Sequence, residues 1–231
     1  MAGRTTGGRG TSGGGPPRPA RGAPARNLAE DRLRAAIGRG DMAPGQRLVE
    51  EELAALYGVT RSGVRLAIDA LIGEGLAERI PNRGARVRAV SPAEAVEIIE
   101  CRMVLEGLIA RKAAERITDA EADRLRAHGE RLREALADGE PLKYSELIVE
   151  LHALLRELAR QTTAAGLVGR LQAQIVRHQF QLSLRPGRPQ RSLAELQELV
   201  AAVTDRDPDR AERAARAHLQ NVIAALPDDG R

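Results

Sequence analysis

Aromatic residues are nearly absent from this chain, and their scarcity restricts the possible folds more than any other feature. Only Tyr57, Tyr144 and Phe180 are aromatic among 231 residues, so the hydrophobic core has to be built from Leu, Ile, Val and Ala. All-β sandwiches and barrels depend on aromatic and β-branched residues, whereas Leu and Ala favour helices. At 42% hydrophobic residues, the chain can form one large domain or two small ones. The composition therefore predicts a mainly α protein.

Charge and cysteine content narrow the class of protein further. No stretch approaches 18 uncharged apolar residues, and no apolar segment follows the N-terminal arginines as it would in a secretory signal. The single Cys101 cannot form an internal disulfide. We therefore expect a soluble, cytoplasmic protein that does not enter a membrane.

Residues 1–26 differ in composition from the rest of the chain. They hold eight Gly, four Pro, five Arg and no acidic residue. Such a segment buries too little apolar area to fold, which predicts a disordered basic tail or a cationic arm that touches DNA. The other 205 residues have 31 basic and 32 acidic side chains, so the basic pI of the chain derives from this tail.

Residues 27–90 have the pattern of a winged helix-turn-helix domain. We expect a helix that starts at Asn27 and ends near residues 38–40, a second over 50–57, and a third over 61–73 capped by Thr60. Two extended segments over 76–80 and 85–90, joined by the turn PNRG, predict a hairpin. Three helices and a hairpin in this order indicate DNA binding.

Residues 91–227 predict an all-α helical bundle of about six helices. Ser91-Pro92-Ala93-Glu94 and Thr118-Asp119-Ala120-Glu121 both have the spacing of a capping box, with helices to about Ile117 and Asp138. Further helical patterns run over 141–161, 164–184, 190–204 and 208–225.

The third helix of the N-terminal domain carries the candidate DNA contacts. The first turn of such a helix enters the major groove, where Arg61 and Arg65 can bind guanine O6 and N7. Short hydroxyl groups at a helix N-terminus favour phosphate. The predicted DNA-binding residues, including those of the wing turn, are Thr60, Arg61, Ser62, Arg65, Arg83 and Gly84.

The run PGQRLVEEELAALYGVTRSGVRLAIDALIGEGLAERIPNRGARV resembles the DNA-binding domain of GntR-type bacterial regulators. The segment IIECRMVLEGLIARKAAERI and the later LH and RAHL motifs resemble the FadR-type FCD effector domain. The resemblance covers nearly all of 27–226 and implies a homodimer that binds a pseudo-palindromic operator. Two residues depart from the family pattern in the third helix, since Gly63 stands where the family usually has Pro and Leu66 where it has Glu.

The resemblance also implies a divalent metal held by one Asp and three His, but this chain keeps only part of that set. His152 and His218 match two ligands, whereas Ile148 stands at the Asp position and Leu196 at the remaining His position. Two imidazoles make a poor divalent site, so we expect no metal cofactor. Substitute ligands could come from four other residues, Glu150, Gln174, His178 and Glu195.

Three residues are the candidates for effector binding: Arg102, His152 and His218. Arg102 could bind the carboxylate of a small acidic effector, or form a surface salt bridge to Glu106 four residues on. The two histidines could contact an effector directly, or could be core residues hydrogen-bonded across helices.

The sequence favours a transcriptional regulator, more specifically a repressor, whose operator affinity a small acidic metabolite modulates. A constitutive dimeric DNA-binding protein without an effector is the alternative. A helical enzyme with His152 or His218 as general base finds no support, because the sequence has no phosphate-binding loop, nucleophile elbow, HExxH motif or carboxylate pair.

Overall fold

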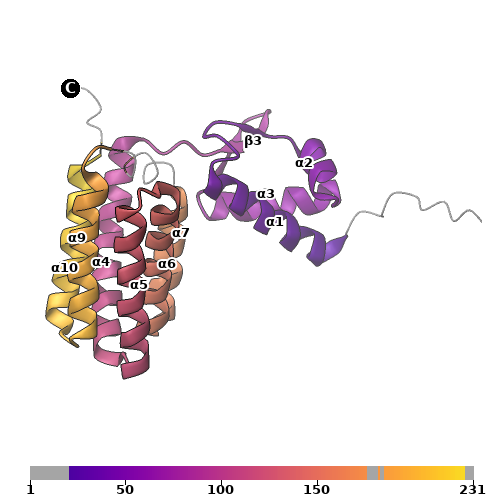
Figure 1. Ribbon diagram of the computed structural model, residues 1–231. Helices are drawn as coiled ribbons and strands as arrows, with labels where there is room; N and C mark the ends of the chain where they lie inside the picture. The colour runs from indigo at the N-terminus through magenta and orange to yellow at the C-terminus, as the bar shows by residue number, and fades with distance from the viewer. Residues whose placement is uncertain (1–20, 176–181, 183–184, 227–231) are drawn as a thin grey trace, which may run out of the picture.

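The computed structural model describes residues 21–175, 182 and 185–226, which form two lobes side by side (Figure 1). The N-terminal lobe holds three helices and a small sheet, and the C-terminal lobe is a bundle of long helices. The mainly α class, with a winged helix-turn-helix lobe before an all-α lobe, is confirmed. No helix in the described ranges is long and apolar enough to cross a membrane.

The helices of the N-terminal lobe are α1 (Gly22–Arg39), α2 (Glu50–Tyr57) and α3 (Arg61–Gly73). Each uses its Leu, Ile, Val and Ala side chains to fill one shared core, as the scarcity of aromatic residues requires. Tyr57 is the aromatic residue of this lobe, and its ring lies 5.8 Å from the guanidinium carbon of Arg32.

Helix α1 begins five residues before the predicted start at Asn27. Its N-cap is Arg21, which makes no side-chain cap, and Ala25 is fully buried. A Cβ atom at Gly63 would lie only 3.1 Å from that of Ala25, so two small residues allow α1 and α3 to approach closely. The assignment of residues 22–26 to a tail was wrong because they form the start of α1, where Ala25 packs against α3. Residues 1–20 lie outside the described residues.

The sheet has the order β1-β3-β2, with both pairs antiparallel. Strands β2 (Ala77–Ile80) and β3 (Gly84–Val87) form the predicted hairpin, while β1 (Arg47–Leu48) was not predicted because two residues leave no periodic pattern. The hairpin turn needs positive φ at Asn82 (59°) and Gly84 (85°), which explains those residue types. The hairpin extends beside α3 as the wing.

The C-terminal lobe contains α4 (Pro92–Arg116), α5 (Asp119–Ala137), α6 (Pro141–Ala159), α7 (Thr162–Gln174), α9 (Arg188–Thr204) and α10 (Pro208–Ala224). Helix α4 lies at the centre of the bundle and packs against α6, α7, α9 and α10 (Figure 1). These bounds agree with the predicted helices to within a few residues, except that the helix predicted over 164–184 already ends at Gln174; residues 176–181 and 183–184 lie outside the described residues. The core is aliphatic around Tyr144.

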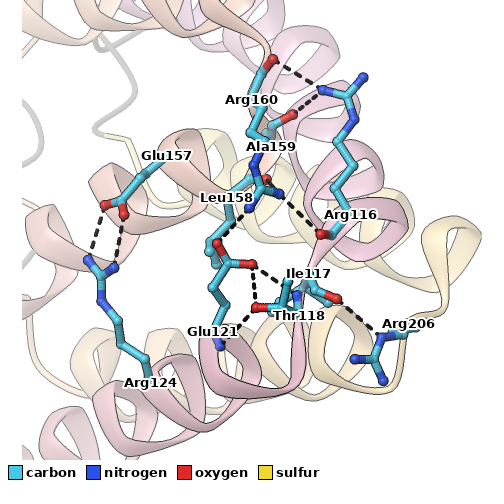
Figure 2. A network of polar contacts seen from close by, with 10 residues as sticks. All are labelled: Arg116, Ile117, Thr118, Glu121, Arg124, Glu157, Leu158, Ala159, Arg160 and Arg206. Atoms are coloured by element: carbon cyan, nitrogen blue, oxygen red, sulfur yellow. Dashed lines mark hydrogen bonds and ion pairs between the residues drawn. The ribbon is translucent and has the colours of Figure 1, made fainter.

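The end of the bundle farthest from the N-terminal lobe is closed by polar contacts around the start of α5 (Figure 2). Thr118 and Glu121 form the predicted capping box in both directions. Arg116 donates to the carbonyl oxygens at the end of α6, and Arg160 donates to Glu121 at 2.7 Å. The ends of α4 and α6 are thereby joined to α5.

The second predicted capping box forms only in part. Ser91 accepts a hydrogen bond from the backbone N–H of Glu94, but the Glu94 carboxylate pairs with Arg88 instead of turning back to Ser91. Arg88 follows β3 and Glu94 lies in the first turn of α4, so this ion pair bridges the segment that connects the lobes. The Glu94 side chain, predicted to cap α4, stabilises that connection instead.

The lobes touch where α7 ends. Gln174 donates to the carbonyl oxygen of Glu74 at 2.9 Å and accepts from Arg88 at 3.3 Å. Ala173 packs against the core of the N-terminal lobe. Gly75, at φ 75°, leaves room for the Gln174 amide, because a Cβ atom there would lie 2.8 Å from its nitrogen.

Candidate nucleic-acid interface and interior cavity

The outward face of α3 carries the residues predicted to contact DNA. The helix buries Val64, Ala67, Ile68 and Leu71, which leaves Arg61, Ser62, Arg65, Leu66 and Asp69 exposed. Thr60 caps the helix through its hydroxyl group, which accepts from the Gly63 N–H and lies 3.2 Å from the Ser62 hydroxyl. The N-terminal turn therefore presents backbone N–H groups and short polar side chains to the same side.

Both arginines of this face lie beside acidic residues from the first turn of α2. Arg65 forms two hydrogen bonds to Glu50, from Nε at 2.9 Å and Nη2 at 2.8 Å. Arg61 is 4.0 Å from Glu51, and both side chains are largely exposed. The hydrogen bonds from Arg65 lower the pKa of the Glu50 carboxyl group, which agrees with an ion pair between the two side chains.

The wing completes a groove along α3. Arg83 and Gly84 are exposed in the hairpin turn, and Arg47 from β1 donates to the Arg83 carbonyl oxygen at 3.1 Å. The arginines that line the groove are Arg47, Arg61, Arg65, Arg79 and Arg83. Arg47 and Arg79 were not predicted as site residues. Arg79 lies two residues after the buried Ala77, so alternation along β2 would have placed it on the buried face.

In the C-terminal lobe, the predicted effector residue Arg102 is buried in an ion pair. Its Nε and Nη2 donate to Glu106 Oε1 at 2.9 and 2.6 Å, and its Nη1 has no hydrogen-bond partner among the described residues. The expected pairing with Glu106 is formed, but inside the bundle rather than on its surface. Arg102 does not line the cavity described below.

His152 and His218 face each other across the bundle, with ring centroids 5.9 Å apart. Nδ1 of His152 lies 3.3 Å from Glu106, and Nδ1 of His218 lies 2.7 Å from Glu195. Each of these glutamates also forms an ion pair with an arginine, Glu106 with Arg102 and Glu195 with Arg188. The Nδ1 atom of each histidine ring is thus engaged by a carboxylate, Glu106 for His152 and Glu195 for His218.

The two rings reach a cavity of about 200 Å³ between α6, α9 and α10. Its wall is largely aliphatic and includes Ile148, Leu219 and Val222. Its polar groups come from Tyr144, Ser145, His152, Gln172, Arg188, Ser192 and His218. The Tyr144 hydroxyl donates to the Pro189 carbonyl oxygen at 3.0 Å, which fixes the ring at the start of α9.

Arg188 is the residue of this cavity that sequence reasoning missed. It is 9% exposed and donates from Nη1 and Nη2 to Glu195 at 2.9 and 3.1 Å. In the sequence it follows Pro-Gly and precedes Pro, which indicates a surface turn. Its spacing of seven residues from Glu195, two helical turns on the same face, was the available signal.

Burial and pairing set the ionisation of this network. Burial alone would raise the pKa of Glu106, but Arg102 and His152 outweigh it and hold that pKa far below its usual range. Burial likewise opposes ionisation of Glu195, yet His218 and Arg188 lower its pKa to about 2. Burial lowers the pKa of His218 despite the neighbouring Glu195. Both carboxylates are therefore ionised at pH 7, and His218 is neutral.

The residues present do not fit the metal site that the resemblance implies. Leu196 is fully buried in the aliphatic core, and Ile148 offers no donor atom to the cavity. Nδ1 of each histidine is engaged by a carboxylate, so the pair offers two Nε2 atoms, fewer donors than a divalent cation requires.

The predicted substitute ligands do not complete the set. Glu150 lies beside His128 and Arg131, Gln174 binds the N-terminal lobe, and Glu195 engages Nδ1 of His218. His178 lies outside the described residues. In the parts of the chain that are described, no cluster of three or more His, Cys, Asp or Glu side chains could hold a metal ion.

Comparisons with known proteins agree with the two lobes. The family of bacterial regulatory proteins called gntR matches residues 26–87, and the FCD domain matches residues 97–221. The transcriptional repressor RspR of Escherichia coli K12 is 29% identical over 185 residues, covering 80% of this chain and 81% of that protein. The repressor NanR of Cronobacter sakazakii is 28% identical over 224 residues, covering 85% and 83%.

Solved structures show the same fold. McbR/YncC of E. coli superposes with a TM-score of 0.74 at 20% identity, covering 87% of this chain and 95% of that one. A GntR regulator described as putative, from Rhodococcus sp. RHA1, superposes with a TM-score of 0.70 at 22% identity, covering 90% and 100%. The matching families and the relatives are transcription regulators, which confirms the predicted class of regulator rather than enzyme.

Proposed function

Since this chain belongs to the GntR family of bacterial regulatory proteins and carries an FCD domain, we propose that it represses transcription as a cytoplasmic homodimer. It is a DNA-binding regulator, and its FCD lobe is the effector domain. We further propose that the exposed side of α3 and the wing bind DNA, that the effector is acidic, and that its binding needs no metal.

The DNA-binding face consists of the exposed side of α3 and the wing. Five arginines converge on one groove there, in a lobe whose small core fixes the helix and hairpin relative to each other. One such helix reads only a few base pairs, so two copies on half-sites about 34–36 Å apart supply the specificity of an operator. A two-fold dimer matches a pseudo-palindromic sequence.

The effector is a small acidic molecule bound in the cavity of the FCD lobe. The observation that carries this proposal is Arg188, a guanidinium placed in the wall of a mostly aliphatic cavity. Its two terminal nitrogens bind Glu195, which leaves further N–H groups for a ligand carboxylate. This role replaces that of Arg102, which does not line the cavity.

The two histidines contribute acceptors rather than metal ligands. Because Nδ1 of each ring faces a carboxylate, we assign a proton to Nδ1 in both rings; the neutral ring of His218 then keeps Nε2 as an acceptor. An effector with hydroxyl or N–H groups beside its carboxylate fits this arrangement. The domain then acts without a divalent cation.

The test is thermal unfolding of the full chain with a panel of small carboxylic acids, each paired with its neutral amide and repeated with zinc and with a chelator. An acid at about 100 times its dissociation constant adds roughly 2.7 kcal/mol, a shift of a few degrees. The double variant Arg188→Gln, Glu195→Gln removes both charges together and should lose this response while still binding DNA.

Each outcome has a distinct meaning. Stabilisation by acids but not by amides, unchanged by chelator, supports the acidic effector and the metal-free cavity. Stabilisation by zinc that the chelator reverses contradicts the metal-free cavity. If no acid shifts the melting temperature, the proposal of an acidic effector is wrong.

A further inference from the structure

The contact between Glu50 and Arg65 joins the start of α2 to the exposed face of α3. Both carboxylate oxygens of Glu50 accept from the same guanidinium edge, Oε1 from Nε and Oε2 from Nη2. The Glu50 side chain is 25% exposed and the Arg65 side chain 58% exposed, so the pair lies at the rim of the groove. The contact fixes Arg65 in one orientation before any DNA is present.

The edge that remains free is the one suited to a base. A guanidinium has five N–H groups, one on Nε and two on each Nη. Glu50 uses the Nε–H and one N–H of Nη2, which leaves the end of the fork, with parallel N–H groups on Nη1 and Nη2. Two parallel donors match O6 and N7 of guanine in the major groove.

Glu50 also changes what Arg65 can do with phosphate. An ionised carboxylate 2.8 Å away offsets the charge of Arg65, so its attraction to the DNA backbone of any sequence is weakened. The directional hydrogen bonds of the free edge are retained. The ion pair thus shifts the contribution of Arg65 from general attraction towards base discrimination.

From this geometry we propose that Glu50 is a positioning residue that orients Arg65 end-on towards a guanine and lowers the affinity for unrelated DNA. The inference rests on the assigned DNA-binding face of α3. It names one acidic residue as a determinant of operator specificity, although its own charge repels DNA.

A structural role of Glu50 has to be distinguished from this one. The first turn of α2 contains Glu50, Glu51 and Glu52, and each carboxylate there favours the helix dipole. Glu51 provides a matched control, because it has the same charge one residue away but its contact is a single 4.0 Å approach to Arg61. The isosteric changes Glu50→Gln and Glu51→Gln therefore remove equal charge. Only Glu50→Gln also disrupts a pair of hydrogen bonds to an arginine of α3.

The experiment uses the full chain with a duplex operator selected from random DNA by the unchanged protein. Affinities of the protein, Glu50→Gln and Glu51→Gln are measured at several salt concentrations for this operator, for its single-base-pair variants and for unrelated DNA. Both variants should bind unrelated DNA more tightly. Only Glu50→Gln should lose preference for guanine at one position of each half-site, on the order of tenfold.

Arg65→Ala supplies the second arm. In that background, Glu50→Gln should no longer change base preference, because the side chain it orients is gone. Equal base preference in Glu50→Gln and Glu51→Gln would overturn the proposal, as would an effect of Glu50→Gln that persists without Arg65. Glu50→Ala, which removes both oxygens, should reproduce the effect of Glu50→Gln.

Failure of the underlying assignment is distinguishable from failure of this inference. If α3 is not the reading helix, Arg65→Ala leaves operator affinity unchanged. If α3 reads DNA but Glu50 plays no part, Arg65→Ala weakens operator binding while both glutamate variants keep the base preference of the unchanged protein.

Discussion

The arginine and histidine side chains around the effector cavity are held in place by two carboxylates. Glu106 and Glu195 each bind one arginine and one histidine, so neither histidine nor arginine enters the cavity without support. Buried charges are tolerated when every one has an opposite partner, and removal of one partner leaves the other unpaired. Single changes in this network should therefore cost more than double changes that remove a pair.

Acid should destabilise the FCD lobe through Glu195. Its pKa is about 2 in the folded chain and near 4.5 when unfolded, so the unfolded chain binds protons first as the pH falls. The stabilisation is present above about pH 5 and is lost as the pH falls towards 2. Burial lowers the pKa of His218, which adds a loss of the same sign below its ordinary value of 6.5.

The measurement is the melting temperature between pH 7 and pH 3, for the unchanged chain and for Glu195→Gln. The variant starts less stable and should show a flatter dependence below pH 5. Parallel curves for the two proteins would show that Glu195 does not supply this part of the acid sensitivity.

At the scale of elements, how far the sequence predicted the structure depends on how local the controlling contact is. Helices with apolar periodicity and local caps were predicted closely, as for α3 with Thr60 and α5 with Thr118. Elements defined by distant partners were not. The start of α1 depends on Ala25 meeting Gly63, and the burial of Arg188 depends on Glu195, so their own neighbours in the sequence gave a different prediction.

The two capping motifs provide a matched prediction at this scale. Thr118→Ala removes a complete capping box and should lower stability by about 1 kcal/mol or somewhat more. Ser91→Ala removes one bond of a motif whose glutamate is already engaged by Arg88, so it should cost less. Thermal unfolding followed by far-ultraviolet circular dichroism compares them, and an equal or larger loss for Ser91→Ala would contradict this ranking.

For the whole molecule, the end of α7 connects the effector cavity to the DNA-binding lobe. Gln172 lines the cavity and accepts from Arg156 at 3.1 Å, and two residues later Gln174 binds Glu74 and Arg88. A displacement of this helix end by a ligand would move both contacts together. Such a shared element is what coupling between two sites requires.

Gln174→Ala should loosen the arrangement of the lobes without unfolding either one. The variant loses both hydrogen bonds across the interface, whereas Gln172→Ala, two residues away, keeps them. Small-angle X-ray scattering should show a broader distribution of interatomic distances for Gln174→Ala than for Gln172→Ala. Identical profiles would mean that the other contacts between the lobes, such as the packing of Ala173, set the arrangement without Gln174.

The scarcity of aromatic residues gives this regulator a built-in optical readout. The chain has no tryptophan, and its two tyrosines are divided between the lobes, Tyr57 beside Arg32 and Tyr144 in the cavity wall. Ultraviolet emission of Tyr57→Phe therefore comes from the effector lobe alone, and that of Tyr144→Phe from the DNA-binding lobe alone. Ligand entry and operator engagement can thus be timed separately by stopped-flow fluorescence, without an attached dye.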